Sequence, residues 1–599
     1  MHHPSLLFFL LTLVLPLSAS SPPSHHSHFT KHRRKSAAPP QEYVEVTRPL
    51  ATDSLPPSCT LLILSHSFGN NTDLPPTNTT YSPPPDCTWS RAVLHLSAAA
   101  NGSQHDRIAA VWLSEAELLR TSTPASSAGG VSWNVRKDVT RYSSLLRQSN
   151  LTLSVMLQNS IIDVYTGFYA VNLTVLYYNI AGNANTITAG SHPISLFPPN
   201  QKPTTGKYQN GPAPPKPKNP LKLDENPADQ IIPISASGEE GFWFKIKSGL
   251  DAVNQGIQIP LNTYRAVIEV YASFHGNDEF WYNNPPDTYF ESNGLPKTGS
   301  NGAYREVLVR LDDDVIGSIV PFPVIFGGGI NPLFWEPVVS IGAFDLPSYE
   351  FDLTPFLGLL LDGKLHSFGF GVADAISFWL LDANLHLWLD NGAGKVQAGA
   401  IKFETPTSCL ERQSNFRQLD GEFEIQAKRE NEFSGWVYSS AGNFTTSVVT
   451  KLTFENKVKL NKNGTEKEVE QDVKETKRVE VKDYNGDVVS TLRVERKYPL
   501  RIKSSSLPGA TPNTSLVKTN LEQEVKEVEE DGNSKISLVN KLRSSGWMFA
   551  LGEDVLSGAA TTSQKYQLQG GVCYTRRVLA NNGVIQTDTE GFVCQTATS

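Results

Sequence analysis

Cysteine is scarce in this sequence, with five residues in a chain of 599. None lies in a Cys-x-x-Cys pair or at metal-ligand spacing, so the cysteines argue against a zinc site and we expect no metal. Cys573 and Cys594 flank the turn sequence ANNG, which favours their pairing, and we also expect Cys59 to pair with Cys87. Cys409 is then the odd thiol, although the sequence alone leaves the connectivity open.

Long hydrophobic runs are missing after the first twenty residues. The run LLFFLLTLVLPL at 6–17 is too short to span a bilayer, and the small residues SAS follow it. We expect a signal peptide over residues 1–20, with an N-terminal anchor as the alternative, and no membrane association after its removal. Secretion agrees with eight Asn-x-Ser/Thr sequons, which make the chain a candidate for N-glycosylation at Asn70, Asn78, Asn101, Asn150, Asn172, Asn443, Asn463 and Asn513.

Positive charge is not in excess, because the formal net charge is −8. A nucleic-acid-binding protein needs a basic face, so we expect no nucleic-acid partner. The sequence also lacks the G-x-S-x-G, H-E-x-x-H and dinucleotide-binding patterns, which removes several common enzyme classes from consideration.

What the sequence does contain is short β-branched and aromatic segments separated by Gly, Ser, Asn and Pro. Segments such as IAAVWL (108–113), LTLSVML (151–157) and YAVNLTVLYY (169–178) are typical strands, and no long helical period occurs. We expect a disordered basic leader over 21–42, a β-domain over 43–196, a Pro-rich linker over 197–222 that could be nicked, a second β-domain over 223–404 and a C-terminal β-domain over 405–599.

The expected C-terminal domain differs from the other two in its residue pattern, because charged residues alternate with Val, Leu and Tyr. A period of two predicts strands with one solvated and one buried face. The Asn-Gly pairs at 463–464 and 485–486 predict hairpin turns. The charge run at 522–531 is interpreted as a solvated edge strand that discourages pairing.

Candidate chemistry begins with FHGNDEFWYNNPP at 274–286, which follows a strand and crowds carboxylates, aromatics and amides into one loop. A carboxylate at Glu279, or at its rival Asp278, would be desolvated beside Trp281 and would suit a general acid. Tyr282 could stack on a sugar and Asn277 could hydrogen-bond its hydroxyls. The alternative is a polar turn whose Trp belongs to the core.

A second candidate is GSQHDRIAAVWL at 102–113. Asp106 precedes a strand and stands between His105 and Arg107, and an Arg neighbour keeps a carboxylate ionised as a general base requires. The alternative is an exposed turn Asp with a surface ion pair. Three successive glycines at 327–329 could cradle an anion, but a turn between strands is the favoured interpretation.

The chain resembles the peptide-N(4)-(N-acetyl-beta-glucosaminyl)asparagine amidase A family, the almond-type plant peptide:N-glycanases. The resemblance covers roughly 43 to 599 and rests on DRIAAVWLSEAELLR (106–120), KDVTRYSSLL (137–146), FHGNDEFWYNNPP (274–286), VPFPVIFGGGINPLFWEPV (320–338) and FWLLDANLHLWLD (378–390). It implies a secreted or vacuolar amidase without a cofactor. Such an enzyme releases N-glycans, including core α1,3-fucosylated ones, from glycopeptides or glycoproteins and turns the linking Asn into Asp.

A more distant similarity to the bacterial secreted peptide:N-glycanase implies an all-β fold of two packed jelly rolls with the site between them, to which the C-terminal antiparallel β-domain is added here. By that similarity Asp106 is the catalytic base, with His105 and Arg107 beside it binding substrate, and Glu279 assists the leaving group. We expect a glycan platform from Trp281, Tyr282 and Trp335.

Two departures from the bacterial pattern leave the oxyanion donors open. Gln158 stands where the bacterial enzyme has a further carboxylate, and Pro332 stands where it has an Arg. Gln158, Arg107 and loop N–H groups remain as candidate donors. Two other functions stay open at this point: a non-catalytic secreted carbohydrate-binding protein, for which the aromatic loop alone would suffice, and a glycosidase.

Overall fold

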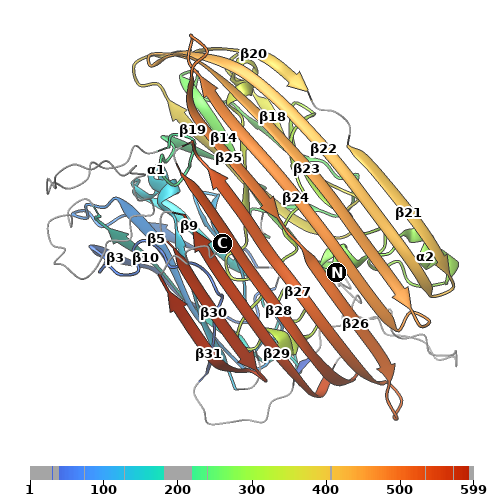
Figure 1. Cartoon of the computed structure of the whole chain (residues 1–599). Coiled ribbons are helices and arrows are strands. Elements are labelled where there is room, and N and C mark those ends of the chain that lie inside the picture. Colours follow the sequence, from blue (N-terminus) through green and yellow to red (C-terminus); the bar gives the residue numbers. More distant parts are fainter. Residues whose placement is uncertain are drawn as a thin grey trace, which may run out of the picture.

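The computed structural model describes residues 30–31 and 40–592, apart from residues 73, 127–128, 181–218, 239, 405–407, 533, 553 and 571–572. The expected signal peptide, most of the expected leader and linker, and Cys594 lie outside the described residues. The all-β expectation is confirmed, because five sheets account for the architecture (Figure 1). Within the described part of the chain, no helix is long and apolar enough to cross a membrane.

The first sandwich pairs a five-stranded sheet with a four-stranded one. The order of the first sheet is β2 (Gln41–Tyr43), β8 (Val131–Asp138), β5 (Arg91–Asn101), β10 (Phe168–Tyr178), β3 (Cys59–Phe68), and that of the second is β4 (Thr77–Tyr81), β9 (Leu151–Leu157), β6 (Ile108–Leu113), β7 (Ala116–Ser122). Alternate residues of β10 are buried, and Val171 of β10 lines the same internal space as Val111 of β6. Period-two burial thus joins the two sheets face to face. A short turn of helix, η1 (Thr140–Tyr142) with α1 (Ser143–Leu146), follows β8.

The second sandwich repeats the arrangement. Its five-stranded sheet runs β11 (Gln230–Ile234), β19 (Trp379–Leu389), β14 (Thr263–Phe274), β17 (Ser348–Asp352), with β12 (Phe244–Ile246) also on β19. Its four-stranded sheet runs β13 (Val253–Ile257), β18 (His366–Ala373), β15 (Glu306–Leu311), β16 (Asp314–Ile319). Its connections carry short helices: η3 (Gly276–Asp278), η4 (Trp281–Asn283), α2 (Asp287–Ser292), η5 (Pro332–Trp335), η6 (Thr354–Phe356) and α3 (Leu357–Leu360).

Beside the two sandwiches lies one thirteen-stranded sheet, which we call the large sheet. It is antiparallel except for its pairing with β1. Its main order is β20 (Gln397–Glu404), β22 (Asp420–Ser439), β23 (Gly442–Asn461), β24 (Glu466–Lys482), β25 (Val488–Lys497), β27 (Thr514–Glu530), β28 (Lys535–Leu551), β29 (Asp554–Gln569), β30 (Tyr574–Asn581), β31 (Val584–Gly591). Three further strands join it: β21 (Cys409–Arg417), β26 (Leu500–Pro508) and β1 (Thr30–Lys31). Because β20 belongs to this sheet, the sheet begins before residue 405, where we expected the third domain to start.

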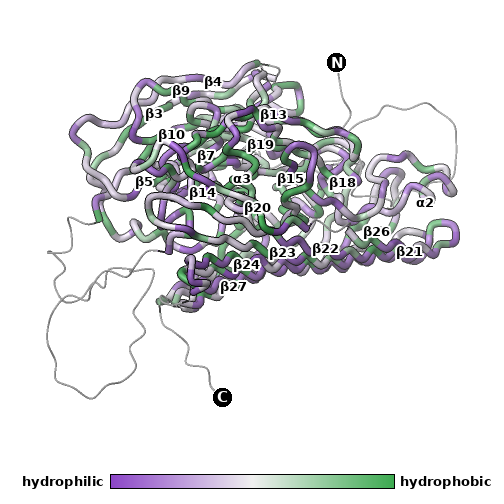
Figure 2. Tube along the Cα trace, turned by 90° about the horizontal axis from the view of Figure 1, so that it is seen from above, coloured by the Kyte–Doolittle hydropathy of each residue, from purple (hydrophilic) through white to green (hydrophobic). Residues whose placement is uncertain are grey.

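The large sheet lies as a flat layer along one side of the two sandwiches (Figure 2). Its inner face supports loops of the second sandwich through buried side chains. The Gln523 amide donates to the Pro323 carbonyl (2.7 Å), the Thr562 hydroxyl to the Phe334 carbonyl (2.8 Å) and the Asn456 amide to the Tyr282 carbonyl (2.8 Å). The sheet therefore holds the same loops that carry the candidate residues.

Two expectations for this layer have different outcomes. The hairpin turns at 463–464 and 485–486 are confirmed, since they join β23 to β24 and β24 to β25. The interpretation of 522–531 as an edge strand is wrong, because most of the run lies in β27, which pairs with β28 on one side and with β25 and β26 on the other. Its charges are compensated across the strands, as where Glu527 pairs with Arg496 (2.7 Å).

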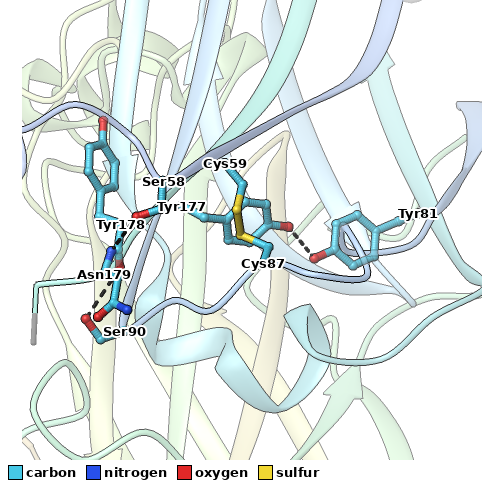
Figure 3. The surroundings of a disulfide bond; sticks show 8 residues. All are labelled: Ser58, Cys59, Tyr81, Cys87, Ser90, Tyr177, Tyr178 and Asn179. Carbon is cyan, nitrogen blue, oxygen red and sulfur yellow. Dashed lines mark hydrogen bonds between the residues drawn. A yellow bond between two sulfur atoms is a disulfide. The ribbon is translucent and has the colours of Figure 1, made fainter. Parts of the chain in front are cut away.

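The disulfide between Cys59 and Cys87 is confirmed, and it ties the start of β3 to the segment before β5 (Figure 3). Beside it, the hydroxyls of Tyr81 and Tyr177 share a hydrogen bond of 2.6 Å. Cys573 is also disulfide-bonded. Cys409 is free, as expected, and the structure places it at an exposed position.

Candidate functional site

Asp106 lies where the two sandwiches meet. It belongs to the loop between β5 and β6 of the first sandwich and is partly exposed. Its Oδ1 accepts a hydrogen bond from the Gly328 N–H (2.8 Å), which belongs to the second sandwich. A Cβ added to Gly327 would lie 3.0 Å from the Ala125 nitrogen and 3.5 Å from the Asp106 Cβ. The glycines thus let the backbone of one sandwich approach the carboxylate of the other.

The glycine loop, residues 327–331, is strained and is held in place by hydrogen bonds within its own sandwich. Ile330 has φ +62°, a rare conformation for a β-branched residue. The turn is closed by a 2.7 Å hydrogen bond from the Asn331 N–H to the Gly329 carbonyl, which also accepts from the indole N–H of Trp335 (2.7 Å). Strain of this kind persists where packing enforces it and is concentrated at functional sites. Trp335, expected in the glycan platform, is 1% exposed and instead fixes this loop.

The neighbours of Asp106 form a half-buried polar group. His105 contacts Tyr165 edge to face at 4.9 Å, and its Nδ1 lies 2.7 Å from the Asp106 carbonyl oxygen. Arg107 donates to the Gln104 side-chain oxygen at 3.2 Å, while its buried Nε has no partner among the described residues. Burial lowers the pKa of Arg107, and nearby Tyr169 and Asp106 oppose that effect. Among the described residues, Arg107 therefore keeps one buried N–H unpaired beside Asp106.

Asp278 is an internal anchor, which corrects its expected role as a substrate-binding residue and rival to Glu279. Its side chain is 0% exposed, and Oδ1 accepts from Arg305 Nε (2.9 Å) and lies 2.8 Å from Arg305 Nη2. Oδ2 accepts from the Ile376 N–H (2.9 Å) and the Trp379 indole (2.7 Å). With both oxygens bonded, Asp278 fastens η3 to the sandwich and cannot face a substrate.

Glu279, the next residue, is partly exposed, and its charge acts on the buried hydroxyl of Tyr282. Burial, and then the charge of Glu279, raises the pKa of the Tyr282 hydroxyl well above its usual value. The ring of Phe280 packs on Gly329, since a Cβ added there would lie 3.1 Å from it. Glu279 thus precedes a residue that packs on the loop whose Gly328 binds Asp106, so the glycine loop links the two candidate catalytic carboxylates.

The aromatic platform expected from the sequence does not form a surface. Trp281 and Tyr282 are 0% exposed and fill the layer between the second sandwich and the large sheet, where Trp281 packs on Phe454 with centroids 6.5 Å apart. The alternative interpretation, a loop whose Trp belongs to the core, is the one the structure favours. Of the other expected binding residues, Asn277 and Gln158 are partly exposed.

Three groups at this site were not singled out from the sequence: the side chains of Gln104 and Tyr165 and the N–H of Gly328. The three-glycine run was noticed, but its contact with Asp106 joins residues more than two hundred positions apart. Nothing in the local sequence could indicate that contact.

Comparison with known proteins decides the family. The family model described as peptide N-acetyl-beta-D-glucosaminyl asparaginase amidase A matches residues 44–406, and the model of its C-terminal domain matches residues 422–500. A relative from Prunus dulcis, named peptide-N4-(N-acetyl-beta-glucosaminyl)asparagine amidase A, is 38% identical over 563 residues, which is 93% of each chain. The chain belongs to the peptide N-acetyl-beta-D-glucosaminyl asparaginase amidase A family.

Two solved structures are also similar to this amidase A family member. Peptide:N-glycanase F from Flavobacterium meningosepticum has 14% sequence identity and a TM-score of 0.32, over 55% of this chain and 96% of its own. PNGF-II has 12% identity and a TM-score of 0.33, over 55% of this chain and 66% of its own.

The chemistry that this amidase A family member can perform follows from its own side chains. Within the described ranges, no group of three or more His, Cys, Asp or Glu could hold a metal ion. The junction instead offers a half-exposed carboxylate, a partly exposed guanidinium and a second carboxylate on the next loop. These groups suit proton transfer and the stabilisation of a developing negative charge.

Proposed function

We propose that this protein hydrolyses the side-chain amide between Asn and N-acetylglucosamine in N-glycopeptides, with Asp106 as the general base. The observation that carries the proposal is the Asp106 carboxylate at the junction of the sandwiches, oriented by the Gly328 N–H and beside Arg107. A base held from the opposite sandwich is oriented before substrate binds, which reduces the ordering required in the transition state.

In the proposed reaction, Asp106 takes a proton from water as the water oxygen attacks the amide carbonyl. The tetrahedral oxyanion that forms would accept from the partly exposed guanidinium of Arg107. The carbon–nitrogen bond then breaks, and Glu279 delivers a proton to the departing glycosylamine. The products are an Asp residue in the peptide and a glycan carrying an amine, so atoms and charge balance without a cofactor.

The decisive experiment is mass spectrometry of an N-glycopeptide incubated with the wild type and with Asp106→Asn. The Asn side chain still accepts from Gly328, so the fold is retained while the base is lost. We expect a fall in turnover of at least about 100-fold, as for removal of a general base. Asp86→Asn, at an exposed position of the first sandwich, is the matched control and should match the wild type.

The products also separate the alternatives. Conversion of the linking Asn to Asp by the wild type identifies an amidase, whereas a cut between sugars identifies a glycosidase. A bound but uncut glycopeptide would move the protein to the carbohydrate-binding class. Near-normal activity of Asp106→Asn would contradict the assignment of the base.

We further propose that the protein works outside the cytosol, secreted or vacuolar, on glycopeptides or glycoproteins. The Cys59–Cys87 disulfide supports an oxidising compartment. All eight sequon asparagines are exposed, which supports passage through the secretory route, where N-glycosylation takes place.

A further inference from the structure

We propose that a polar pocket between the second sandwich and the large sheet binds one neutral sugar ring of the glycan. The inference rests on the proposed function and extends its substrate beyond the scissile linkage. The pocket has a volume of about 190 Å³ and lies where α2 faces β21 and β22, at one end of the large sheet (Figure 1). Sites for drug-sized ligands start at about 300 Å³, so this one suits a single small ring.

The pocket has the two-sided lining that a sugar ring requires. Apolar side chains on one side come from Phe423, Ile425 and Val458 of the large sheet. Polar groups from the second sandwich include Asn284 and Asn301, and Gln413 adds a polar side chain from β21 of the large sheet. A pyranose presents C–H groups on its faces and hydroxyls at its rim, so it matches both kinds of lining.

The charges around the pocket are already paired, which argues for a neutral ligand. Arg412 forms an ion pair with Asp374, and Glu424 forms one with Lys457. Asp287 accepts a hydrogen bond from the backbone N–H of Asn301 (2.7 Å). An anion or a cation would have to break one of these pairs, whereas a hydroxyl can add to them.

One buried atom of the lining has no partner among the described residues. Asn284 is 1% exposed, its Nδ2 donates to the Ser300 carbonyl (3.3 Å), and its Oδ1 has no hydrogen-bond partner in the described chain. An unbonded buried oxygen costs free energy unless water or a ligand supplies a donor. Asn284 lines the pocket, so a small shift of its side chain toward a bound ring would let a sugar hydroxyl supply that donor.

The pocket is connected to the candidate catalytic site by the chain itself. Asn284 caps η4 in the loop that carries Glu279, and Asn456, which also lines the pocket, donates to the Tyr282 carbonyl of that loop (2.8 Å). A ring bound here would therefore fix the loop that bears Glu279, next to the Ser300 carbonyl, which accepts from both Asn284 and Arg305.

The test is isothermal titration calorimetry with a free oligomannose N-glycan, which has no peptide and no scissile amide. Ser414 lines the pocket from the exposed face of β21, so Ser414→Trp fills it with minimal cost to the fold. We expect at least about tenfold weaker binding by Ser414→Trp, which is the loss of a few polar and apolar contacts. Asn415→Trp, the adjacent exposed position that does not line the pocket, should bind like the wild type.

Kinetics extend the same comparison to substrates. For Ser414→Trp we expect KM to rise about tenfold on a glycopeptide carrying the whole glycan and to stay unchanged on one carrying a single N-acetylglucosamine. Asn284→Ala should weaken binding of the free glycan without filling the pocket, which separates loss of the unbonded oxygen from a steric effect.

Each outcome bears on one claim. Failure of the free glycan to bind the wild type, or equal binding by Ser414→Trp, overturns the sugar pocket. Absence of release from both glycopeptides overturns the proposed amidase activity, while calorimetry still reports on the pocket.

Discussion

At the scale of the residue, Asp278 and Glu279 show how two adjacent carboxylates acquire different roles. Asp278 points into the sandwich, where Arg305 is its buried counterion, and Glu279 lies partly exposed. The separation follows from the short helix η3, which turns consecutive side chains to different sides of the chain. The buried member thus fixes the backbone from which the exposed member acts.

Replacing Asp278 should unfold the loop rather than alter its chemistry. Asp278→Asn leaves Arg305 buried without its charge partner, and loss of one partner of a buried pair costs about 3 to 5 kcal/mol. Denaturant unfolding would measure the loss, and Asp314→Asn, at an exposed position of the same sandwich, should change stability little. Stability equal to the wild type would contradict the anchoring role.

At the scale of the element, the glycine loop over 327–331 depends on η5. The Trp335 indole bonds the Gly329 carbonyl, next to the Gly328 N–H that binds Asp106. Trp335→Phe keeps the aromatic packing and removes the donor. The loop should then hold Asp106 less firmly.

We expect Trp335→Phe to lower kcat about tenfold while KM stays within about twofold, because an orienting bond is lost and no substrate contact is removed. Trp547→Phe, at a 41% exposed position of β28, is the matched control. A rise in KM without a fall in kcat would instead return Trp335 to the glycan-contacting role expected from the sequence.

The elements also show what local sequence can predict. The segments 108–113 and 151–157 were predicted as strands and coincide with β6 and β9, because turn residues bound each apolar alternation. The charged strand at 522–531 was misplaced, since alternation gives the faces of a strand and says nothing of its neighbours. Asp106 and Glu279 were recognisable as candidates. The burial of Trp281 and Trp335 could not be recognised from the sequence, because it depends on a sheet formed by the last third of the chain.

At the scale of the whole molecule, the two sandwiches meet through buried polar contacts. Glu269 of β14 is central: Arg141 binds its Oε1 (2.8 Å), and Tyr142 (2.8 Å) and His386 (3.2 Å) bind Oε2. Ser348 donates to Oε1 at 2.7 Å, and the charge of Lys137 also acts on Glu269. Burial raises the pKa of Glu269, but Arg141 and His386 outweigh it and hold the pKa well below its usual 4.5.

This arrangement predicts how stability depends on pH. A carboxylate whose pKa is depressed in the folded state stabilises the fold above its unfolded pKa, and that contribution is lost as pH falls through the folded value. Stability from Glu269 should therefore be complete in mildly acidic solution and decline below about pH 4.5.

Unfolding free energies of Glu269→Gln at neutral and acidic pH test the point. We expect a loss of about 1.5 to 3 kcal/mol at neutral pH, the range for a hydrogen bond to a charged group, and a smaller loss as pH falls. Glu422→Gln, on the exposed face of the large sheet, should cost less than about 1 kcal/mol. An equal loss at every pH would show that Glu269 does not carry the acid response.

Glycosylation at the eight exposed sequon asparagines would make the molecule a carrier of the linkage that its proposed site cleaves. Each glycan released from a neighbouring copy replaces a neutral amide by a carboxylate and adds one negative charge to a chain whose isoelectric point is already about 5.9. A glycosylated preparation of the active protein would therefore age into a ladder of increasingly acidic forms. The same preparation of Asp106→Asn would keep a single charge state. The number of acidic forms seen in isoelectric focusing would therefore count the linkages that the protein has cleaved on its own copies.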